Sequence, residues 1–408
     1  MRERGPVAKI SLPRFFSLIR VTETITTITS ETDSARAGAE LGRAIHRAFH
    51  GAPADAVVLF ASAQHDYPRL LRALSEEAGT TTIAGSSSAG EFTDSQHKEG
   101  HVSAMAIRSP DIRCAIGVGR GIGRDPAAAA RQVAAGFKGL TGPALPYRSA
   151  LVMTDALAGH TDAVVEELTL LTGGNYRFFG GGAGDDGRFR QTHVFAGTEA
   201  YSDALVALEL QSVQPLGVGV AHGWVPAGPG YRVTESAGSL LVSLNGAPAQ
   251  QAIEEHARQS GQRFDPADPM PFFLHNIIGI QSDGHYRLRV PLGVNPDGSV
   301  PCAADIPTGA VVHFMRTSQE SAVKAAEQAT RAALAALGGR KPAAALVFDC
   351  VATRLRLGKA FDDELRACAD LLAPAPFVGC NTYGQIARAE GQFGGFHNCT
   401  AVVCVIPH

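Results

Sequence analysis

Three glycine-containing segments are the most distinctive part of the sequence and its first candidates for chemistry. Residues 83–92 run as an apolar pair, a glycine, four small or polar residues, a second glycine, a polar residue and an apolar one, and residues 377–386 repeat this order. Residues 178–185 form a looser copy, with one residue fewer between the outer glycines. Glycine permits close approach to the backbone, and the N–H groups of such loops can point at a carboxylate. The pattern therefore predicts loops that could hold a small polar ligand.

The candidate ligand contacts are the glycines and polar side chains of these three segments. Glu91, Asp185 and Gln385 are predicted to occupy equivalent places after the three loops, where each either stabilises the turn or contacts a ligand. Asp186 follows Asp185 directly. Adjacent residues on a strand point to opposite faces, so this pair is poorly placed for acid/base catalysis. The predicted contacts are Gly85, Ser86, Ser87, Gly90, Glu91, Gly184, Asp185, Gly379, Asn381, Gly384 and Gln385.

A histidine among aromatic residues is the candidate cofactor ligand. If residues 189–195 form a strand, Phe189, His193 and Phe195 share one face with Gln191. A histidine on such an inward face is commonly a core residue with satisfied hydrogen bonds. The alternative is a ligand to haem or another apolar cofactor, because imidazole in an apolar wall suits haem iron. His193, flanked by Phe189 and Phe195, is therefore the candidate haem and metal ligand if this second interpretation holds.

Several catalytic chemistries are excluded by spacing. No Walker A pattern occurs, and the glycines of residues 85–90 stand too far apart for the Gly-x-Ser-x-Gly turn of a hydrolase. Residues 117–123 lack the Gly-x-Gly-x-x-Gly register of a dinucleotide loop. A cysteine-dependent enzyme stays an alternative, with Cys350 or Cys380 as nucleophile, because N–H groups of the glycine loop could lower the pKa of Cys380.

Composition limits the class of protein. A chain of 408 residues exceeds one ordinary core, so two domains are expected. The net charge of -3 gives no electrostatic reason to bind nucleic acid or an anionic membrane. No apolar run is long enough for a transmembrane helix, and the N-terminus does not resemble a secretory signal. The seven cysteines include no Cys-x-x-Cys pair, which favours reduced thiols in a cytoplasmic protein over a zinc ribbon or disulfide framework.

The elements that must position the loops follow one repeated order. Each loop is preceded by an apolar run, a helical segment and a second apolar run, as expected for a strand, a helix and a strand that ends in the loop. The predicted fold class is α/β (α+β mixed), with layered sheets built from repeated β-α-β units in two related domains. The predicted division is an extended or loosely ordered tail at residues 1–34, an N-terminal domain at 35–212 and a C-terminal domain at 213–408.

Several segments together resemble the FIST family of bacterial sensory proteins, which have an N-terminal and a C-terminal FIST domain. The resemblance covers about residues 35–408. Gln385 departs from it, because a glutamate is expected after the C-terminal loop. The segments that carry it are residues 83–91, 181–186, 192–195, 233–234, 244–249, 346–350, 383–387 and 396–400.

The resemblance implies a sensor of a small molecule rather than an enzyme, with amino acids proposed as ligands of such domains. In length and layout the chain is similar to stand-alone FIST proteins that bind haem, sense nitric oxide and act on a partner histidine kinase. It therefore implies haem as cofactor and a separate histidine kinase as partner, and it leaves a homo-oligomer open. The alternative is a sensor of an amino acid or similar small polar metabolite, held by the glycine loops.

Overall fold

Three successive parts of the chain fold into the same order of elements, strand–helix–strand–helix–strand–hairpin–strand, in the computed structural model, which describes residues 21–282, 284–388 and 395–408. The first unit is β1 (Glu23–Thr29), α1 (Ser34–Ala48), β2 (Ala56–Ala61), α2 (Tyr67–Ala78), β3 (Ile83–Ser87), β4 (Glu91–Thr93), β5 (His97–Lys98) and β6 (Val102–Arg108). The second is β7 (Ile112–Arg120), α3 (Pro126–Gly136), α4 (Lys138–Thr141), β8 (Tyr147–Thr154), the 3₁₀ turn η1 (Ala156–Ala158), α5 (Thr161–Leu171), β9 (Arg177–Gly182), β10 (Val194–Ala196), β11 (Glu199–Tyr201) and β12 (Ala204–Ser212).

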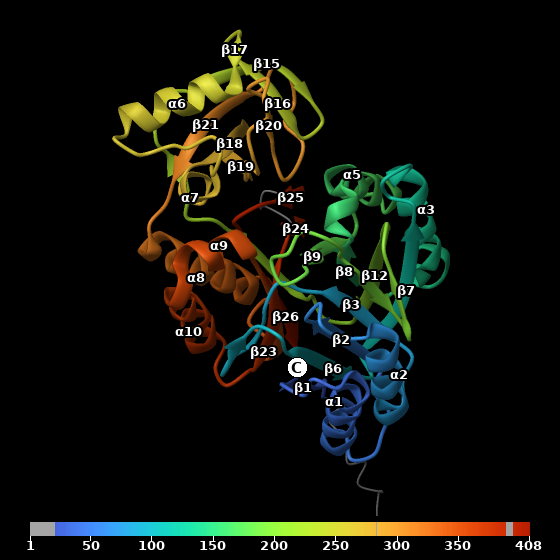
Figure 1. The fold of residues 1–408 in the computed structure, drawn as a ribbon. Coiled ribbons are helices and arrows are strands. Elements are labelled where there is room, and N and C mark those ends of the chain that lie inside the picture. Colours follow the sequence, from blue (N-terminus) through green and yellow to red (C-terminus); the bar gives the residue numbers. More distant parts are fainter. Residues whose placement is uncertain (1–20, 283, 389–394) are drawn as a thin grey trace, which may run out of the picture.

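The third unit has the same order but is interrupted after its first strand by an inserted domain (Figure 1). It consists of β13 (Gly217–Ala221), α8 (Gln319–Ala336), β22 (Pro342–Cys350), α9 (Val351–Leu357), η2 (Gly358–Ala360), α10 (Phe361–Leu372), β23 (Phe377–Thr382), β24 (Gln385–Arg388), β25 (Gly395–His397) and β26 (Ala401–Pro407). The inserted domain contains β14 (Val225–Pro226), β15 (Tyr231–Ala237), β16 (Leu240–Leu244), β17 (Ala247–Pro248), α6 (Ala249–Gln259), α7 (Met270–Phe273), β18 (Ile277–Ser282), β19 (His285–Arg289), β20 (Val300–Pro301) and β21 (Val311–Arg316).

The hairpin of each unit is exchanged with a neighbouring unit. The three sheets have the orders β1-β6-β2-β3-β10-β11, β7-β12-β8-β9-β24-β25 and β13-β26-β22-β23-β4-β5. Thus the first unit gives its hairpin to the third sheet, the second gives its hairpin to the first, and the third gives its hairpin to the second. This cyclic exchange closes the three units into one body.

The main core lies between the sheets, and the helices cover their outer faces. Phe348 of the third sheet is 5.6 Å from Phe60 of the first and 6.4 Å from Phe179 of the second, between ring centroids. Separate apolar clusters pack α1 and α2 on the first sheet, α3 and α5 on the second, and α8 and α10 on the third. The fold class predicted from the sequence, mixed α/β with layered sheets and repeated β-α-β units, is confirmed.

Local signals explain where the helices begin. Asp33, Asp66 and Asp125 each accept a hydrogen bond from a backbone N–H in the first turn of α1, α2 and α3. Such side chains satisfy N–H groups that have no partner inside the helix. The three glycines at the start of the loop motifs have a packing role. At Gly85, Gly180 and Gly379, a Cβ would lie 1.8, 2.2 and 2.0 Å from a carbonyl oxygen of the neighbouring parallel strand.

The N-terminal tail was expected to be extended or loosely ordered up to residue 34, and residues 1–20 of it lie outside the described residues. In the described part, β1 is extended and pairs with β6 over its whole length as an edge strand. Its Thr and Ile residues suit such a half-buried position. One expectation about local structure is wrong. The expected strand over residues 189–195 begins only at Val194, and Phe189 has a left-handed backbone with φ of 52°. The predicted boundary between residues 212 and 213 falls between β12 and β13.

Candidate functional site

The three glycine loops meet and bind one another through their backbones. Each loop exchanges hydrogen bonds with both of the others, so the three close a ring where β3, β9 and β23 end. The bonds run from Ala89 N to Asn381 O (2.9 Å), Asn381 N to Gly90 O (2.8 Å), Gly184 N to Ser87 O (3.0 Å), Asp186 N to Ser88 O (3.0 Å), Gly182 N to Gly384 O (2.9 Å) and Tyr383 N to Gly182 O (2.9 Å). Many of the N–H groups predicted to face a ligand are therefore used to join the loops.

The predicted contacts inside the loops are buried. Ser87 accepts a hydrogen bond from the backbone N–H of His193 at 2.9 Å. Ser86 Oγ and both amide atoms of Asn381 are buried with no hydrogen-bond partner among the described residues. The remaining predicted glycines face neighbouring atoms at close range: a Cβ at Gly90 would lie 2.8 Å from Asn381 Oδ1, one at Gly184 2.7 Å from Ala89 N, and one at Gly384 2.1 Å from the Phe396 ring.

The expected equivalence of Glu91, Asp185 and Gln385 is wrong in one member. Glu91 pairs with Cys380 and Gln385 pairs with Gly181, which in each case is the residue after the first glycine of the loop motif. In the remaining sheet the residue at this position is Val194, which pairs with Ser86. Asp185 lies earlier, in a loop that is longer in the second unit. Glu91 is fully buried, and this burial raises its pKa to about 8. Hydrogen bonds donated by Ser88 and by the His101 N–H act in the opposite direction and lower the pKa.

Asp185 organises the loop that follows it. Its carboxylate accepts hydrogen bonds from the Tyr383 hydroxyl and from three backbone N–H groups, those of Phe189 (2.8 Å), Arg190 (2.6 Å) and Gln191 (2.9 Å). Burial opposes ionisation of Asp185, but these hydrogen bonds outweigh it and hold its pKa below the usual range. All four donors belong to the protein, so this carboxylate has a structural role in the loop.

His193 and its two aromatic neighbours do not form one apolar wall. Phe195 is fully buried and contacts Tyr67, with ring centroids 4.8 Å apart, and His193 lies 5.1 Å from the same ring. Phe189 instead stacks on Tyr383 at 4.3 Å and is 49% exposed. Burial lowers the pKa of His193. Its Nδ1 is buried without a hydrogen-bond partner among the described residues.

A second polar site lies beside the loops, where the inserted domain joins the third unit. A small cavity there has room for about one water molecule (about 10 Å³). Its walls come from the end of β13 and the start of the inserted domain, from Thr317 where the chain returns, and from α8, β22, α9, α10 and the turn before β26. It is lined by Ala221, His222, Gly223, Trp224, Thr317, Ala322, Ala325, Asp349, Thr353, Arg356, Glu364, Cys399 and Ala401.

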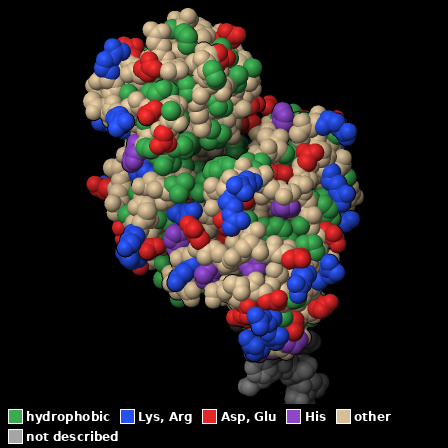
Figure 2. Space-filling view, viewed as in Figure 1, with side chains coloured by type: hydrophobic (Ala, Val, Ile, Leu, Met, Phe, Trp, Pro, Cys, Tyr) green, Lys and Arg blue, Asp and Glu red, His purple; other side chains and the backbone are tan. Residues whose placement is uncertain are grey.

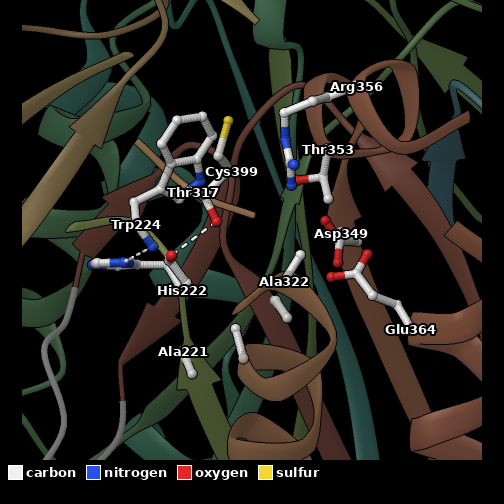
Figure 3. Close-up of a pocket in the computed structure, with 13 residues that line it drawn as sticks. Ala221, His222, Trp224, Thr317, Ala322, Asp349, Thr353, Arg356, Glu364 and Cys399 are labelled. Atoms are coloured by element: carbon white, nitrogen blue, oxygen red, sulfur yellow. Dashed lines mark hydrogen bonds between the residues drawn. The ribbon is translucent and has the colours of Figure 1, made fainter. Parts of the chain in front are cut away.

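Two buried carboxylates and one guanidinium group face this cavity. Figure 3 shows the carboxylates of Asp349 and Glu364 turned toward one another and Arg356 beside Thr353. Asp349 accepts a hydrogen bond from the Cys350 N–H at 2.5 Å, and Thr353 also donates to it. The guanidinium carbon of Arg356 lies 5.5 Å from the centre of the Trp224 ring, a cation–π distance.

The charges of the cavity are incompletely balanced. Burial, followed by repulsion from Glu364, raises the pKa of Asp349 well above its usual range. Burial also raises the pKa of Glu364 to about 7, against the attraction of Arg356. Glu364 Oε2 and Arg356 Nε are buried without hydrogen-bond partners among the described residues. Unpaired polar atoms in a buried position are costly, and such groups commonly mark a ligand or water position.

Comparison with known proteins identifies the family. The sequence profile of the FIST N domain matches residues 55–247, and that of the FIST C domain matches residues 251–388. The chain belongs to the FIST family. The search of curated proteins finds no match. A solved structure of a cyanuric acid hydrolase aligns with 95% of this chain and 100% of its own at 12% identity and a TM-score of 0.30, a likeness too low to support an argument.

The cavity draws on both FIST matches, since His222 and Trp224 fall in the first and Asp349, Arg356 and Glu364 in the second. The segments that carried the family resemblance supplied Asp349, Cys350 and Cys399. Sequence reasoning missed Trp224, Arg356 and Glu364. One signal was available for Glu364: it closes an acidic run at the start of α10, where a position facing inward could be expected from the helical period.

The two cysteines considered as nucleophiles differ. Burial raises the pKa of Cys380 well above its usual range, so the expectation that the glycine loop lowers it is wrong. Cys350 behaves in the opposite way. The pKa of Cys350 is lowered to about 6, chiefly by hydrogen bonding from the Cys399 thiol. Burial opposes this shift, and further donors that include Gln385 add to it. FIST domains are sensory domains in general, which fits the prediction of a protein that is not an enzyme.

Proposed function

We propose that this FIST protein senses a small ligand that carries both an ammonium group and a carboxylate, as a free amino acid does. The cavity between the third unit and the inserted domain receives it. The observation that carries the proposal is the pair of unpaired buried atoms, Glu364 Oε2 and Arg356 Nε, on two residues that line one cavity. The glycine loops, where such a ligand was first expected, use much of their hydrogen bonding on one another.

Each charged residue has a role that follows from its position. Asp349 and Glu364 accept hydrogen bonds from the ligand ammonium group, which supplies the positive charge that the buried carboxylates lack. Arg356 donates its free Nε–H to the ligand carboxylate while its guanidinium plane stays over Trp224. Alanines line the opposite side, so a short apolar side chain fits there.

Binding requires the cavity to enlarge, because it now has room for about one water. Its walls include both places where the chain passes between the third unit and the inserted domain, near His222 and Thr317. Figure 2 shows a hollow between that domain and the rest of the molecule, with hydrophobic side chains on both sides. A small rotation of the inserted domain thus opens or closes the cavity, and a ligand held in it shifts that equilibrium.

Thermal-shift and calorimetric titration test the proposal with a panel of amino acids, matched amines without a carboxylate and matched carboxylates without an amine. An amino acid at a hundred times its dissociation constant stabilises the protein by about 2.7 kcal/mol. Glu364→Gln weakens binding about tenfold or more, because a neutral amide oxygen replaces the ionised acceptor of the ligand ammonium group. The matched control is Glu320→Gln, on the exposed side of α8. No stabilisation by any amino acid, or full affinity in Glu364→Gln, contradicts the proposal.

Haem binding with nitric oxide sensing, and signalling to a separate histidine kinase, stay predictions that rest on the family resemblance. The specific observation in favour of haem is the unpartnered Nδ1 of His193. Against it, Phe189 stacks on Tyr383 whereas Phe195 packs on Tyr67, so the two rings have different packing partners. An absorption spectrum recorded after haem addition is the test. A shifted Soret band that is lost in His193→Ala supports ligation, and an unchanged free-haem spectrum rejects it.

A further inference from the structure

Two thiols lie side by side at the edge of the cavity. Cys350 is the last residue of β22, and Cys399 lies in the turn that leads into β26, the antiparallel neighbour of β22. That ladder pairs Phe348 with Val402, so two residues further on Cys350 faces the turn that contains Cys399. Both belong to one small apolar cluster with Trp224, and hydrogen bonding by Cys399 is the main cause that lowers the pKa of Cys350.

The pair differs from the other cysteines of the chain. All seven cysteines are free thiols. The hydrogen bond from Cys399 favours the thiolate of Cys350, whereas burial raises the pKa of the remaining five, Cys114, Cys302, Cys368, Cys380 and Cys404. Cys350 is thus the cysteine most readily attacked by an oxidant, because the thiolate is the reactive form.

Access to the pair runs through the cavity. Cys399 lines it and is 5% exposed, and Cys350, in the same apolar cluster, is 3% exposed. The cavity has room for about one water, so a hydroperoxide as small as hydrogen peroxide needs little opening to reach the sulfur atoms. Cys399 also has a left-handed backbone, with φ of 50°, at the turn that leads into β26.

We propose that Cys350 and Cys399 form an oxidisable pair that a hydroperoxide converts into an intramolecular disulfide. The Cys350 thiolate attacks the peroxide oxygen, the O–O bond breaks, and the leaving oxygen takes up a proton to give water or an alcohol. Cys350 becomes a sulfenic acid. The Cys399 sulfur attacks the Cys350 sulfur, the S–O bond breaks, and the Cys399 proton leaves with the hydroxide as water. Two thiols and one hydroperoxide give one disulfide, one water and one water or alcohol.

The disulfide changes a wall of the ligand cavity, because Cys399 lines it. This consequence rests on the proposed function, whereas formation of the disulfide does not. Oxidation therefore couples the redox state to ligand sensing, and reduction by a thiol restores the open pair.

Mass spectrometry of the full-length protein treated with one equivalent of hydrogen peroxide tests the inference without any ligand. The expected product is 2 Da lighter, retains five of the seven free thiols, and gives a non-reduced peptide that joins Cys350 to Cys399. Cys368→Ser, at another buried cysteine, forms the same disulfide. In Cys399→Ser, a sulfenic acid accumulates at Cys350 and is captured by a 1,3-diketone reagent.

Three results overturn the inference: seven free thiols after treatment of the folded wild type, a disulfide between other cysteines, or capture at a residue other than Cys350 in Cys399→Ser. Since the wild-type peptide map decides by itself, the inference stays testable if a variant fails to fold. The map also separates this inference from the proposed function. A disulfide with no amino-acid binding rejects only the ligand, and amino-acid binding with no disulfide rejects only the redox pair.

Discussion

Replacing Glu364 with glutamine tests whether the cavity holds a carboxylate at a cost to stability. The pKa of Glu364 is about 7 in the folded protein, against 4.5 for an exposed glutamate. Folding raises the pKa of Glu364, so the folded state favours the protonated side chain. The contribution of Glu364 to stability is therefore fully present below pH 4.5 and is lost as the pH rises through about 7. Each pKa unit is worth about 1.4 kcal/mol, so the ionised side chain lowers the free energy of unfolding by about 3 kcal/mol at pH 8.

Glu364→Gln removes this loss without changing the size of the side chain. We expect the variant to gain about 3 kcal/mol relative to wild type at pH 8 and less than about 1 kcal/mol at pH 5. Relief of the repulsion on Asp349 adds to the gain at high pH. With an unfolding entropy of about 2.1 cal/mol/K per residue, about 3 kcal/mol over 408 residues raises Tm by about 4 °C.

The assay is thermal unfolding of both proteins between pH 5 and pH 8, without ligand. A constant effect of the new amide appears equally at every pH, so the informative quantity is the change of the Tm difference with pH. Glu320→Gln is the control, because Glu320 is exposed and pairs with Lys324 on the surface of α8. A Tm difference that is the same at pH 5 and pH 8 refutes the reasoning, since the carboxyl then titrates alike in both states.

Three further predictions follow from other contacts. Gly379→Ala places a Cβ 2.0 Å from the carbonyl oxygen of the neighbouring strand, so we expect the free energy of unfolding, measured by urea denaturation, to fall by about 3 kcal/mol or more. The control is Gly293→Ala, where a Cβ meets nothing nearer than 3.8 Å and the free energy of unfolding changes by less than about 1 kcal/mol. Amino-acid affinity rises from pH 6 to pH 8 in isothermal titration, because a ligand ammonium binds ionised carboxylates, and this rise is smaller in Glu364→Gln, where Asp349 alone of the two carboxylates remains. Asp162→Asn breaks the pair with Arg289, at 3.0 Å, that ties α5 to the inserted domain; hydrogen exchange in that domain then increases, and unchanged exchange would show that the pair does not hold it.

Local structure could be predicted because local signals determine it. The helix that begins at Pro126 could be predicted because Asp125 is an acidic cap directly before it. Strand β2 could be predicted because a completely buried strand requires a continuous apolar run. The repetition of strand, helix and glycine loop was also visible, because each unit must build the same layer of helix on sheet.

The exchange of hairpins could not be predicted from the sequence. A strand that leaves its own sheet has the same alternation of apolar and polar residues as one that stays, so periodicity does not say which neighbour it joins. The misplacement of Asp185 has the same origin. Counting residues after the glycine gave Asp185 the position equivalent to Glu91. The pairing of β10 with β3 shows that Val194 occupies that position.

The cavity was missed for a different reason. Its charged residues come from separate elements, Asp349 from β22, Arg356 from α9 and Glu364 from α10, and each is unremarkable in its own segment. Only tertiary packing turns them inward. Burial then gives them their properties, since the raised pKa of Glu364 comes first from loss of water around it.

The position of the cavity argues for a sensing role more strongly than its residues alone. The three units are held by exchanged hairpins and by backbone hydrogen bonds among their loops, so a ligand bound inside that ring would have to break many bonds to change the fold. The inserted domain is different, because the chain enters it after β13 and leaves it before α8, and both crossings lie at the cavity. A ligand that bridges Arg356 and Glu364 therefore acts at the joint between a rigid body and a separate domain. Binding at this joint favours one position of the inserted domain, and such a shift can carry the proposed signal to a partner.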